Sequence, residues 1–151
     1  MAELSPAEVL AAVPHRPPFR FVDEILELDD EHIVAAYRFA PDADFYRGHF
    51  PGRPVTPGVL LVEAMAQAAV VAHGLYLVAK TMPAAELGAG LYLFTEASVE
   101  FAGMVAPGER VTIHGRKVFL RRQKLRSAVE MTGADGRIVC IGTLAGVRVP
   151  A

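Results

Sequence analysis

The sequence predicts one α+β domain in which a curled antiparallel sheet of about six strands wraps around a single long apolar helix. Residues 57–79 form an apolar stretch long enough for about six helical turns. Alternating segments typical of strands lie on both sides of it, most of them between residues 91 and 149. A helix that is apolar all round must be covered all round, which a flat sheet cannot do. At 151 residues the chain fits a single domain, residues 1–151.

The segments before this helix predict a short lead-in helix and two strands. Within residues 1–13, Ser5 can act as the N-cap, the following proline can take the first helical position, and Glu8 can close a capping box. Prolines then keep the chain extended, because a residue before proline avoids the helical region. Alternating apolar residues predict strands over residues 19–28 and 33–39, joined by an acidic turn.

The loop at residues 41–57 leads into the central helix. It has no hydrophobic periodicity, and its prolines make it stiff rather than loose. Thr56 is a candidate N-cap and Pro57 a candidate first helical residue, so the sequence predicts a helix over 57–79. Four further strands are expected at residues 91–101, 110–119, 125–131 and 137–149, with a hairpin turn at 134–137.

The apolar helix also has the length of a membrane span. Glu63 near its middle would cost about 2–3 kcal/mol inside a bilayer. The alanines of the helix would offset little of that cost, and no basic cluster flanks the segment. We therefore expect a core helix and no membrane association.

Composition and charge narrow the class of protein. Apolar residues make up 52% of the chain and the formal net charge is −2, which excludes a disordered chain. The single cysteine, Cys140, excludes an internal disulfide framework and a multi-cysteine metal site. The N-terminus lacks the basic start and apolar run of a secretory signal, so we expect a cytoplasmic protein.

The most informative residues for chemistry are His49, in the rigid loop, and Glu63, the only ionisable residue in the first sixteen positions of the expected helix. A neutral imidazole can accept a proton near neutral pH, and apolar surroundings favour the protonated form of a carboxyl group. Removal of water across a carbon–carbon bond needs such a pair. The base takes a proton from the carbon beside a carbonyl, and the acid protonates the leaving hydroxyl.

The start of the helix offers a third group. Pro57 has no N–H, so the first free backbone donors belong to Gly58 and Val59, at the positive end of the helix dipole. A thioester carbonyl bound there would be polarised as its enolate forms. Glu63 follows about 7.5 Å further along the helix axis.

Structural roles compete with these assignments. A histidine next to glycine and phenylalanine often only supports its loop, and Glu63 could serve a local donor such as Gln67, one turn later. A metal site built from His49, Glu63 and His73 lacks suitable ligand spacing, so no metal is expected. The other histidines have no acidic setting in the sequence, and we expect surface or core positions for His15, His32 and His114.

Basic residues cluster at 116–126, which holds six of the fifteen lysines and arginines and no acid. The segment predicts either a solvated strand face or a positive patch for an acidic protein or a phosphate-bearing arm. Nucleic acid is not the expected partner, because the net charge is negative and no recognition motif is present.

Two stretches resemble a known family. PHRPPFRFVDEILEL (14–28) and FYRGHFPGRPVTPGVLLVEAMAQAA (45–69) are similar to the beta-hydroxyacyl-acyl carrier protein dehydratases of the FabZ type. The resemblance implies the hot-dog fold, a curled antiparallel sheet around a central helix. It also implies a homodimer, with trimers of such dimers common in the family. The substrate would be carried as a thioester on the phosphopantetheine of an acyl carrier protein, with no other cofactor.

The resemblance carries over to individual residues. It implies that His49 is the base, that Glu63 of the other subunit is the acid, and that the amide of Gly58, with Val59 beside it, polarises the carbonyl. Thr56 and Arg53 depart from the usual family residues beside the acyl channel, so the acyl chain length stays open. We expect Phe50, Thr56 and Gln67 to line or support the channel, and Arg121, Arg122, Lys124 and Arg126 to dock the carrier.

The implied activity is dehydration of 3-hydroxyacyl thioesters to trans-2-enoyl thioesters, in fatty acid, polyketide or polyene biosynthesis. Two other functions stay open. A hot-dog thioesterase would use a similar cleft and release a free acid. A non-catalytic subunit would bind acyl carriers without turning over their cargo.

Overall fold

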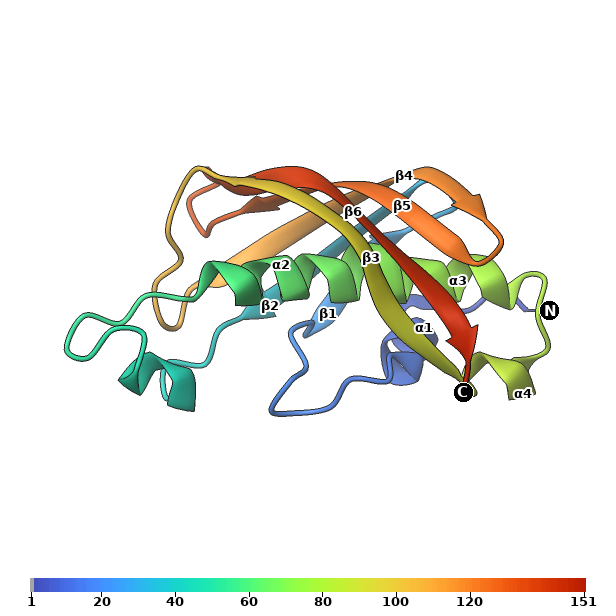
Figure 1. Ribbon diagram of the computed structural model, residues 1–151, viewed down its shortest axis with the longest axis horizontal. Coiled ribbons are helices and arrows are strands. Elements are labelled where there is room, and N and C mark those ends of the chain that lie inside the picture. The colour runs from blue at the N-terminus through green and yellow to red at the C-terminus, as the bar shows by residue number, and fades with distance from the viewer. Residues whose placement is uncertain (1) are drawn as a thin grey trace.

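The computed structural model, which describes residues 2–151, confirms an antiparallel sheet curled around a central helix (Figure 1). The strand order is β1-β2-β4-β5-β6-β3, and each neighbouring pair is antiparallel. The strands are β1 (Glu24–Leu28), β2 (His32–Arg38), β3 (Gly90–Phe101), β4 (Arg110–Arg121), β5 (Lys124–Thr132) and β6 (Ile138–Pro150). The helical segments are α1 (Pro6–Ala12), the 3₁₀ turn η1 (Asp44–Arg47), α2 (Gly58–Ala66), the π-helical η2 (Gln67–Ala72), α3 (His73–Ala79) and α4 (Ala84–Leu87).

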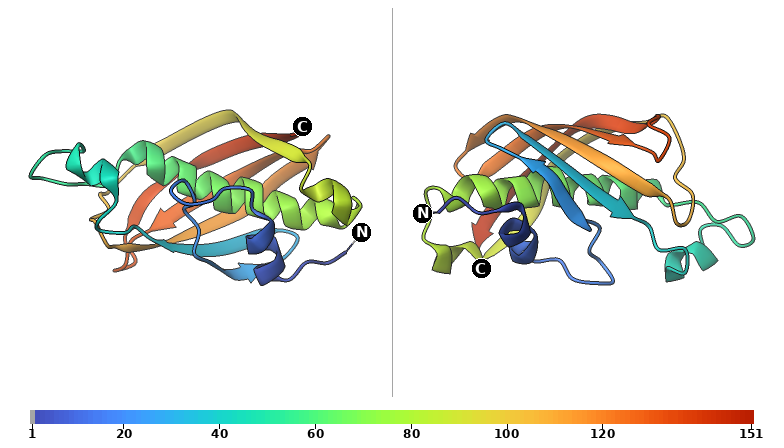
Figure 2. Two further views of the ribbon diagram at one scale, coloured as in Figure 1. Left: turned by 90° about the horizontal axis from the view of Figure 1, so that it is seen from below. Right: turned by 180° about the vertical axis from the view of Figure 1, so that it is seen from behind.

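The central helix runs through α2, η2 and α3 as 22 continuous residues, and the sheet folds around it (Figure 2). Two sheet glycines allow the helix to lie close. A Cβ on Gly115 would stand 2.7 Å from Ala69 Cβ, and one on Gly146 would stand 2.8 Å from Val70 Cγ1. By length and composition the helix could cross a membrane, but 67% of its most apolar window is buried within the protein. Such burial is typical of a core helix.

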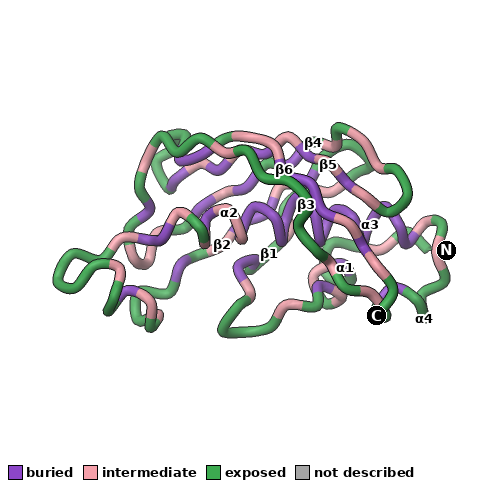
Figure 3. Tube along the Cα trace, in the orientation of Figure 1, coloured by how far each residue is buried: buried purple, intermediate pink, exposed green. Residues whose placement is uncertain are grey.

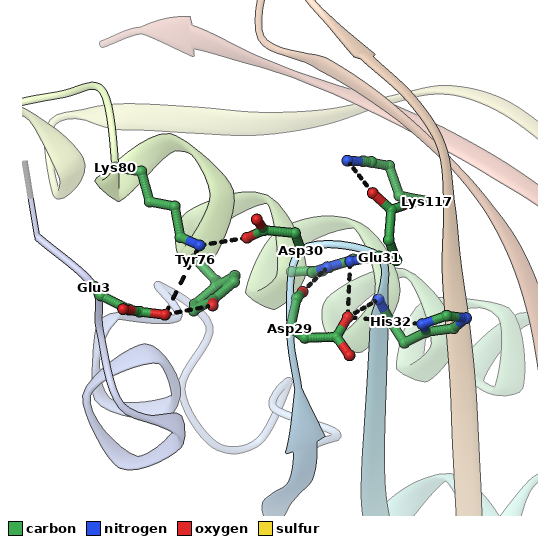
Figure 4. Close-up of polar contacts among 9 residues, drawn as sticks. Glu3, Asp29, Asp30, Glu31, His32, Tyr76, Lys80 and Lys117 are labelled. Carbon is green, nitrogen blue, oxygen red and sulfur yellow. Dashed lines mark hydrogen bonds and ion pairs between the residues drawn. The ribbon is translucent and has the colours of Figure 1, made fainter.

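Polar contacts fasten the N-terminal segment and the β1–β2 turn to the end of α3 (Figure 4). The hydroxyl of Tyr76 donates to Glu3 Oε1 at 3.1 Å. Lys80 pairs with Asp30, and its Nζ lies 4.4 Å from the centre of the Tyr76 ring. Exposed pairs of this kind contribute little free energy each, so their role here is to fix the chain segments in place.

Two local predictions are confirmed: the capping box of α1 and the hairpin turn before β6. Ser5 Oγ accepts from the backbone N–H of Glu8 at 3.2 Å, and Ser5 N–H donates to Glu8 Oε2 at 2.8 Å, which completes the capping box of α1. The turn before β6 closes where Gly133 N–H donates to Arg137 O at 2.9 Å, with Gly136 at φ 85°.

The predicted strand over residues 19–28 is wrong in its first half, because β1 begins only at Glu24. The backbone of Phe19 and Phe21 bonds to a helix side chain instead of to a neighbouring strand. Phe21 N–H donates to Gln67 Oε1 at 2.8 Å, and Gln67 Nε2 donates to Phe19 O at 3.0 Å. The alternation of apolar residues predicts that this segment is extended, but it does not predict which groups its backbone bonds to.

The predicted cap of the central helix is also wrong. Pro57 is the N-cap, without a side-chain cap, and the helix begins at Gly58. The buried Thr56 hydroxyl lies 2.6 Å from the hydroxyl of Tyr46 and holds the loop rather than the helix end. Local sequence does not distinguish these two uses of a threonine, because Tyr46 reaches it only through the folded loop.

Strand β3 forms one edge of the sheet, and most of its residues are exposed (Figure 3). About half of the surface of each of four large apolar side chains is exposed: 54% for Leu91, 50% for Leu93, 48% for Phe94 and 53% for Phe101. An apolar edge strand of twelve residues is a typical surface for pairing with another chain.

Candidate functional site

His49 lies in the loop that extends beyond the end of the sheet (Figure 1). Its Nδ1 lies 2.8 Å from the carbonyl oxygen of Val55, and its backbone accepts from Val55 N–H at 2.9 Å. A carbonyl can only accept, so Nδ1 carries the hydrogen and Nε2 of the neutral ring presents a lone pair. Within residues 2–151 that Nε2 has no hydrogen-bond partner. The loop therefore leaves Nε2 of His49 free to accept a hydrogen bond.

Glu63 projects from α2 toward two polar neighbours. Its Oε1 accepts from Gln67 Nε2 at 2.9 Å, and His15 Nε2 lies 3.5 Å from the same oxygen. Only 18% of the Glu63 side chain is exposed. The expected partnership with Gln67 is confirmed. The N-terminal segment also brings a histidine to the carboxylate, a contact that the helix sequence alone does not predict.

Gln67 is a fully buried positioning residue for this carboxylate. The backbone N–H of Phe21 fixes its amide oxygen, so its Nε2 must face Glu63 and Phe19 O. The expected supporting role of Gln67 thus has a definite geometry, in which one amide satisfies two backbone groups and orients the acid.

His15 was expected to have no acidic neighbour, and that expectation is wrong. Burial lowers the pKa of His15, and the negative charge of Glu63 partly opposes the shift. A neutral His15 near pH 7 can donate from only one ring nitrogen. Its Nδ1 is buried without a partner in the described chain, which leaves Nε2 as the nitrogen that faces Glu63. The two residues are 48 positions apart in the sequence, so no local spacing could have joined them.

The amides of Gly58 and Val59 open the central helix without a side-chain cap. Helix-start amides lack intrahelical partners and lie at the positive end of the dipole. The ring of Phe101 lies so close that a Cβ on Gly58 would stand 3.1 Å from its Cε1. Val59 is 76% exposed and Phe50 is 57% exposed.

A narrow channel of about 80 Å³ follows the central helix from Glu63 toward its C-terminal end. Ala66, Val70, Gly74 and Val78 form its helix wall. The sheet wall includes residues of four strands and of the β4–β5 turn: Tyr92, Leu93 and Phe94 of β3, Leu120 of β4, Gln123 of the turn, Leu125 of β5, and Val147 and Arg148 of β6. Most residues that line the channel are apolar, and Glu63 places a carboxylate at one end of its helix wall.

The structure does not join His49 to Glu63 within one chain. Glu63 and His15 line the channel, whereas His49 does not, and no hydrogen bond or ion pair connects His49 to Glu63 in residues 2–151. Within residues 2–151 the two residues are therefore not brought into direct contact.

The basic segment forms the hairpin between β4 and β5, and part of its charge is neutralised. Arg126 lies 2.8 Å and Lys124 3.5 Å from carboxylate oxygens of Glu96, which reaches across from β3. Arg121 stacks on Phe119 and Arg122 occupies the hairpin turn, and both are exposed. The clustering of basic residues did not predict these ion pairs, because Glu96 lies outside the basic segment.

The sequence also singled out His73 and Cys140, and both are buried in the fold. Within residues 2–151 no group of three His, Cys, Asp or Glu side chains could hold a metal ion. His73 is buried and its Nε2 lies 2.9 Å from the carbonyl oxygen of Asp29. Cys140 is buried, and burial raises the pKa of its thiol to about 11, so it stays protonated.

Comparison with known proteins agrees with this fold. A family model described as a FabA-like domain matches residues 13–143. The 3-hydroxyacyl-acyl-carrier-protein dehydratase FabZ of Lactococcus lactis subsp. cremoris is 33% identical, over 91% of this chain and 90% of its own. The FabZ of Streptococcus pyogenes serotype M3 is 36% identical, over 91% and 93%.

Solved structures share the fold at low identity. A Streptococcus mutans protein bound to acetyl CoA has a TM-score of 0.63 at 12% identity, over 91% of this chain and 94% of its own. A hypothetical thioesterase with coenzyme A from Streptococcus pneumoniae has a TM-score of 0.58 at 18% identity, over 84% and 85%. Because the family model and the FabZ relatives cover most of the sequence, this chain belongs to the FabA-like family, among the dehydratases of the FabZ type.

Proposed function

We propose that this protein dehydrates 3-hydroxyacyl thioesters, held on an acyl carrier protein, to trans-2-enoyl thioesters. His49 Nε2 takes a proton from the carbon beside the thioester carbonyl, and that electron pair forms the new double bond. The hydroxyl leaves from the next carbon as water after Glu63 gives it a proton. The amides of Gly58 and Val59 stabilise the charge that develops on the carbonyl oxygen. The observation that carries the proposal is a base with a free Nε2 together with a carboxyl group at the head of an apolar channel.

The site is composed of two subunits. Pairing of two β3 edges in antiparallel directions covers Leu93 and Phe94 and places the Phe101 end of one strand beside the Gly90 end of the other. The Phe101 end carries the helix start, since Phe101 lies against Gly58. Such a two-fold dimer brings the loop of one chain toward the channel of the other, and both copies gain an equivalent site. Three such dimers would form the hexamer common in the family.

The first experiment follows the mass of a 3-hydroxyacyl carrier protein incubated with the protein. We expect loss of one water with the wild type and with the exposed control His114→Ala, but not with His49→Ala. Glu63→Gln keeps the size of the side chain and should lose most of the rate. Release of a free acid would instead identify a thioesterase, and equal turnover by His49→Ala would exclude the proposed base.

Mixing two inactive variants tests the shared site. His49→Ala and Glu63→Gln subunits that exchange freely form mixed dimers in which one of the two sites has both native residues. Random mixing then restores roughly a quarter of the wild-type activity. If both residues acted within one chain, no mixture would recover activity. A rival, non-catalytic carrier-binding subunit would show no dehydration in either experiment.

The carrier approaches the β4–β5 hairpin, where Arg121 and Arg122 remain exposed beside the paired Lys124 and Arg126. In the antiparallel dimer this hairpin lies on the side of the partner's helix start, where the phosphopantetheine arm would enter. Positive charge there favours encounter with an acidic carrier. The pathway is fatty acid or related polyketide or polyene synthesis, carried out in the cytoplasm. The acid–base steps above use only side chains and backbone amides.

A further inference from the structure

The end of the channel farthest from Glu63 lies against α4. Its walls there include one residue of the helix and one from each of two strands: Val78 of α3, Tyr92 of β3 and Leu120 of β4. Leu87 of α4 is buried with Val78 in a small apolar cluster, and Leu120 packs against that cluster. Figure 1 shows α4 near the C-terminus, at the end of the molecule where α3 ends. The short helix α4 therefore supports the far wall of the channel from behind.

Hydrogen bonds fasten α4 in this position. Arg148 of β6 is buried, and it donates from Nη1 to Gln123 Oε1 at 3.0 Å and from Nη2 to the carbonyl oxygen of Glu86 in α4. The Tyr92 hydroxyl donates to the carbonyl oxygen of Leu87 at 3.4 Å and also bonds to Arg148. Buried hydrogen bonds of a charged group are costly to break. Arg148 thus joins α4 to β3, β6 and the β4–β5 turn.

The space between Glu63 and this wall has a defined length. Glu63 and Val78 are fifteen positions apart in one continuous helix, which is about 22 Å along its axis. Gly74 keeps the channel open between them, because a Cβ built there would meet only Leu125 Cδ2, at 3.7 Å. An apolar chain can therefore follow the helix until it reaches Val78.

We propose that α4 is a stop that limits the length of the acyl chain, and that Arg148 is the positioning residue that holds this stop in place. The inference rests on the proposed function and specifies which of its substrates fit. With the thioester near Glu63, a chain that ends before Val78 buries more apolar surface with each added carbon. A longer chain has to displace Val78, which Leu87 supports from behind, so it binds less well.

The test measures kcat/KM for straight-chain 3-hydroxyacyl pantetheine thioesters of increasing length. We expect kcat/KM of the wild type to rise with length and then to drop about tenfold at the first chain that is too long. Leu87→Ala leaves space behind Val78, so the drop should move to a chain about two carbons longer. Leu28→Ala removes the same atoms from the core beside β1, away from the channel, and should keep the wild-type limit.

Gly74→Ala tests the opposite direction in a variant that keeps the fold. The added methyl makes only an ordinary contact, and alanine favours a helix more than glycine does. Because the methyl occupies part of the channel, the drop should move to a shorter chain without a fall in melting temperature. Arg148→Met frees α4 but keeps an apolar side chain, and its limit should move to longer chains; an unmoved limit would reject the role of Arg148. A wild type without a length limit, or the same limit in Leu87→Ala and Gly74→Ala, would overturn the proposal.

Binding distinguishes failure of this proposal from failure of the proposed reaction. Saturated acyl pantetheines have no 3-hydroxyl group and cannot be dehydrated, so their effect on the melting temperature reports binding alone. We expect this stabilisation to increase with chain length up to the same limit, and the limit to move in the variants as it does for kcat/KM. Shifted binding limits without turnover would support the stop and contradict the dehydratase. Turnover with one limit in every variant would reject the stop and leave the dehydratase proposal intact.

Discussion

Replacement of Gln67 by methionine should affect both the fold and the acid. Methionine has a similar length and fills the space, but it cannot bond to Phe21 N–H, Phe19 O or Glu63. A buried polar group without a partner costs about 1–3 kcal/mol. The bond to Phe21 N–H is buried, whereas Phe19 O lies beside a half-exposed side chain and can bond to water. We expect the free energy of unfolding to fall by about 2–4 kcal/mol.

Urea unfolding measures this loss, and the dehydration rate measures the second effect. Without the amide donor, the Glu63 carboxyl group is no longer fixed, and we expect kcat to fall about tenfold at saturating substrate. Ser127→Ala is the matched control. It removes one buried hydrogen bond to the helix, from Ser127 Oγ to Ala69 O at 2.9 Å, without stranding a main-chain N–H. Its cost should be nearer 1 kcal/mol, with kcat unchanged.

Either of two results would refute this reasoning. If Gln67→Met is as stable as the wild type, water or a moved backbone satisfies the N–H of Phe21. If the variant is destabilised but keeps full kcat, Gln67 supports the N-terminal segment and does not position Glu63.

Three further outcomes follow from the structure. Burial lowers the pKa of His73, so the unfolded chain binds its proton more readily and stability is lost as pH falls below about 6.5. Urea unfolding at about pH 7.5 and about pH 5.5 should show a smaller loss for His73→Gln, but not for the exposed His114→Gln. Leu93→Lys should weaken the dimer and reduce activity together, as sedimentation and turnover at several concentrations would show; a monomer with full activity contradicts the shared site. Joint replacement of Arg121 and Arg122 by glutamate should weaken use of carrier-bound substrate about tenfold and spare a pantetheine thioester, whereas equal losses would exclude the docking surface.

Local patterns in the sequence predicted the positions of the helices and strands better than the groups with which those segments form hydrogen bonds. The apolar run at 57–79 and the alternating segments after it gave the helix and four strands nearly to the residue. The start of β1 could not be placed, because Gln67, far along the chain, takes the hydrogen bonds of Phe19 and Phe21. The π-helical turn η2 also has no mark in its alanine-rich sequence.

For the candidate site too, the sequence predicted the residues but not the contacts around them. The motif around His49 and Glu63 identified both residues, but their surroundings depend on long-range contacts. His15 approaches Glu63 only because the rigid proline segment folds back onto α2, and Glu96 meets the basic hairpin only across β6. Arg148 carried no signal, since an arginine in a strand is ordinarily expected on the outer face. The structure buries Arg148, and the alternation of β6 does not predict that burial.

The exposed β3 edge has a consequence for the life of the chain before it assembles. The strand contains no lysine or proline to discourage mispairing, and its acidic residues, Glu96 and Glu100, are its main protection. A newly made monomer therefore presents twelve residues that can pair with any similar edge, including that of a misaligned copy. In the dimer proposed above, pairing of the two β3 edges would remove this hazard.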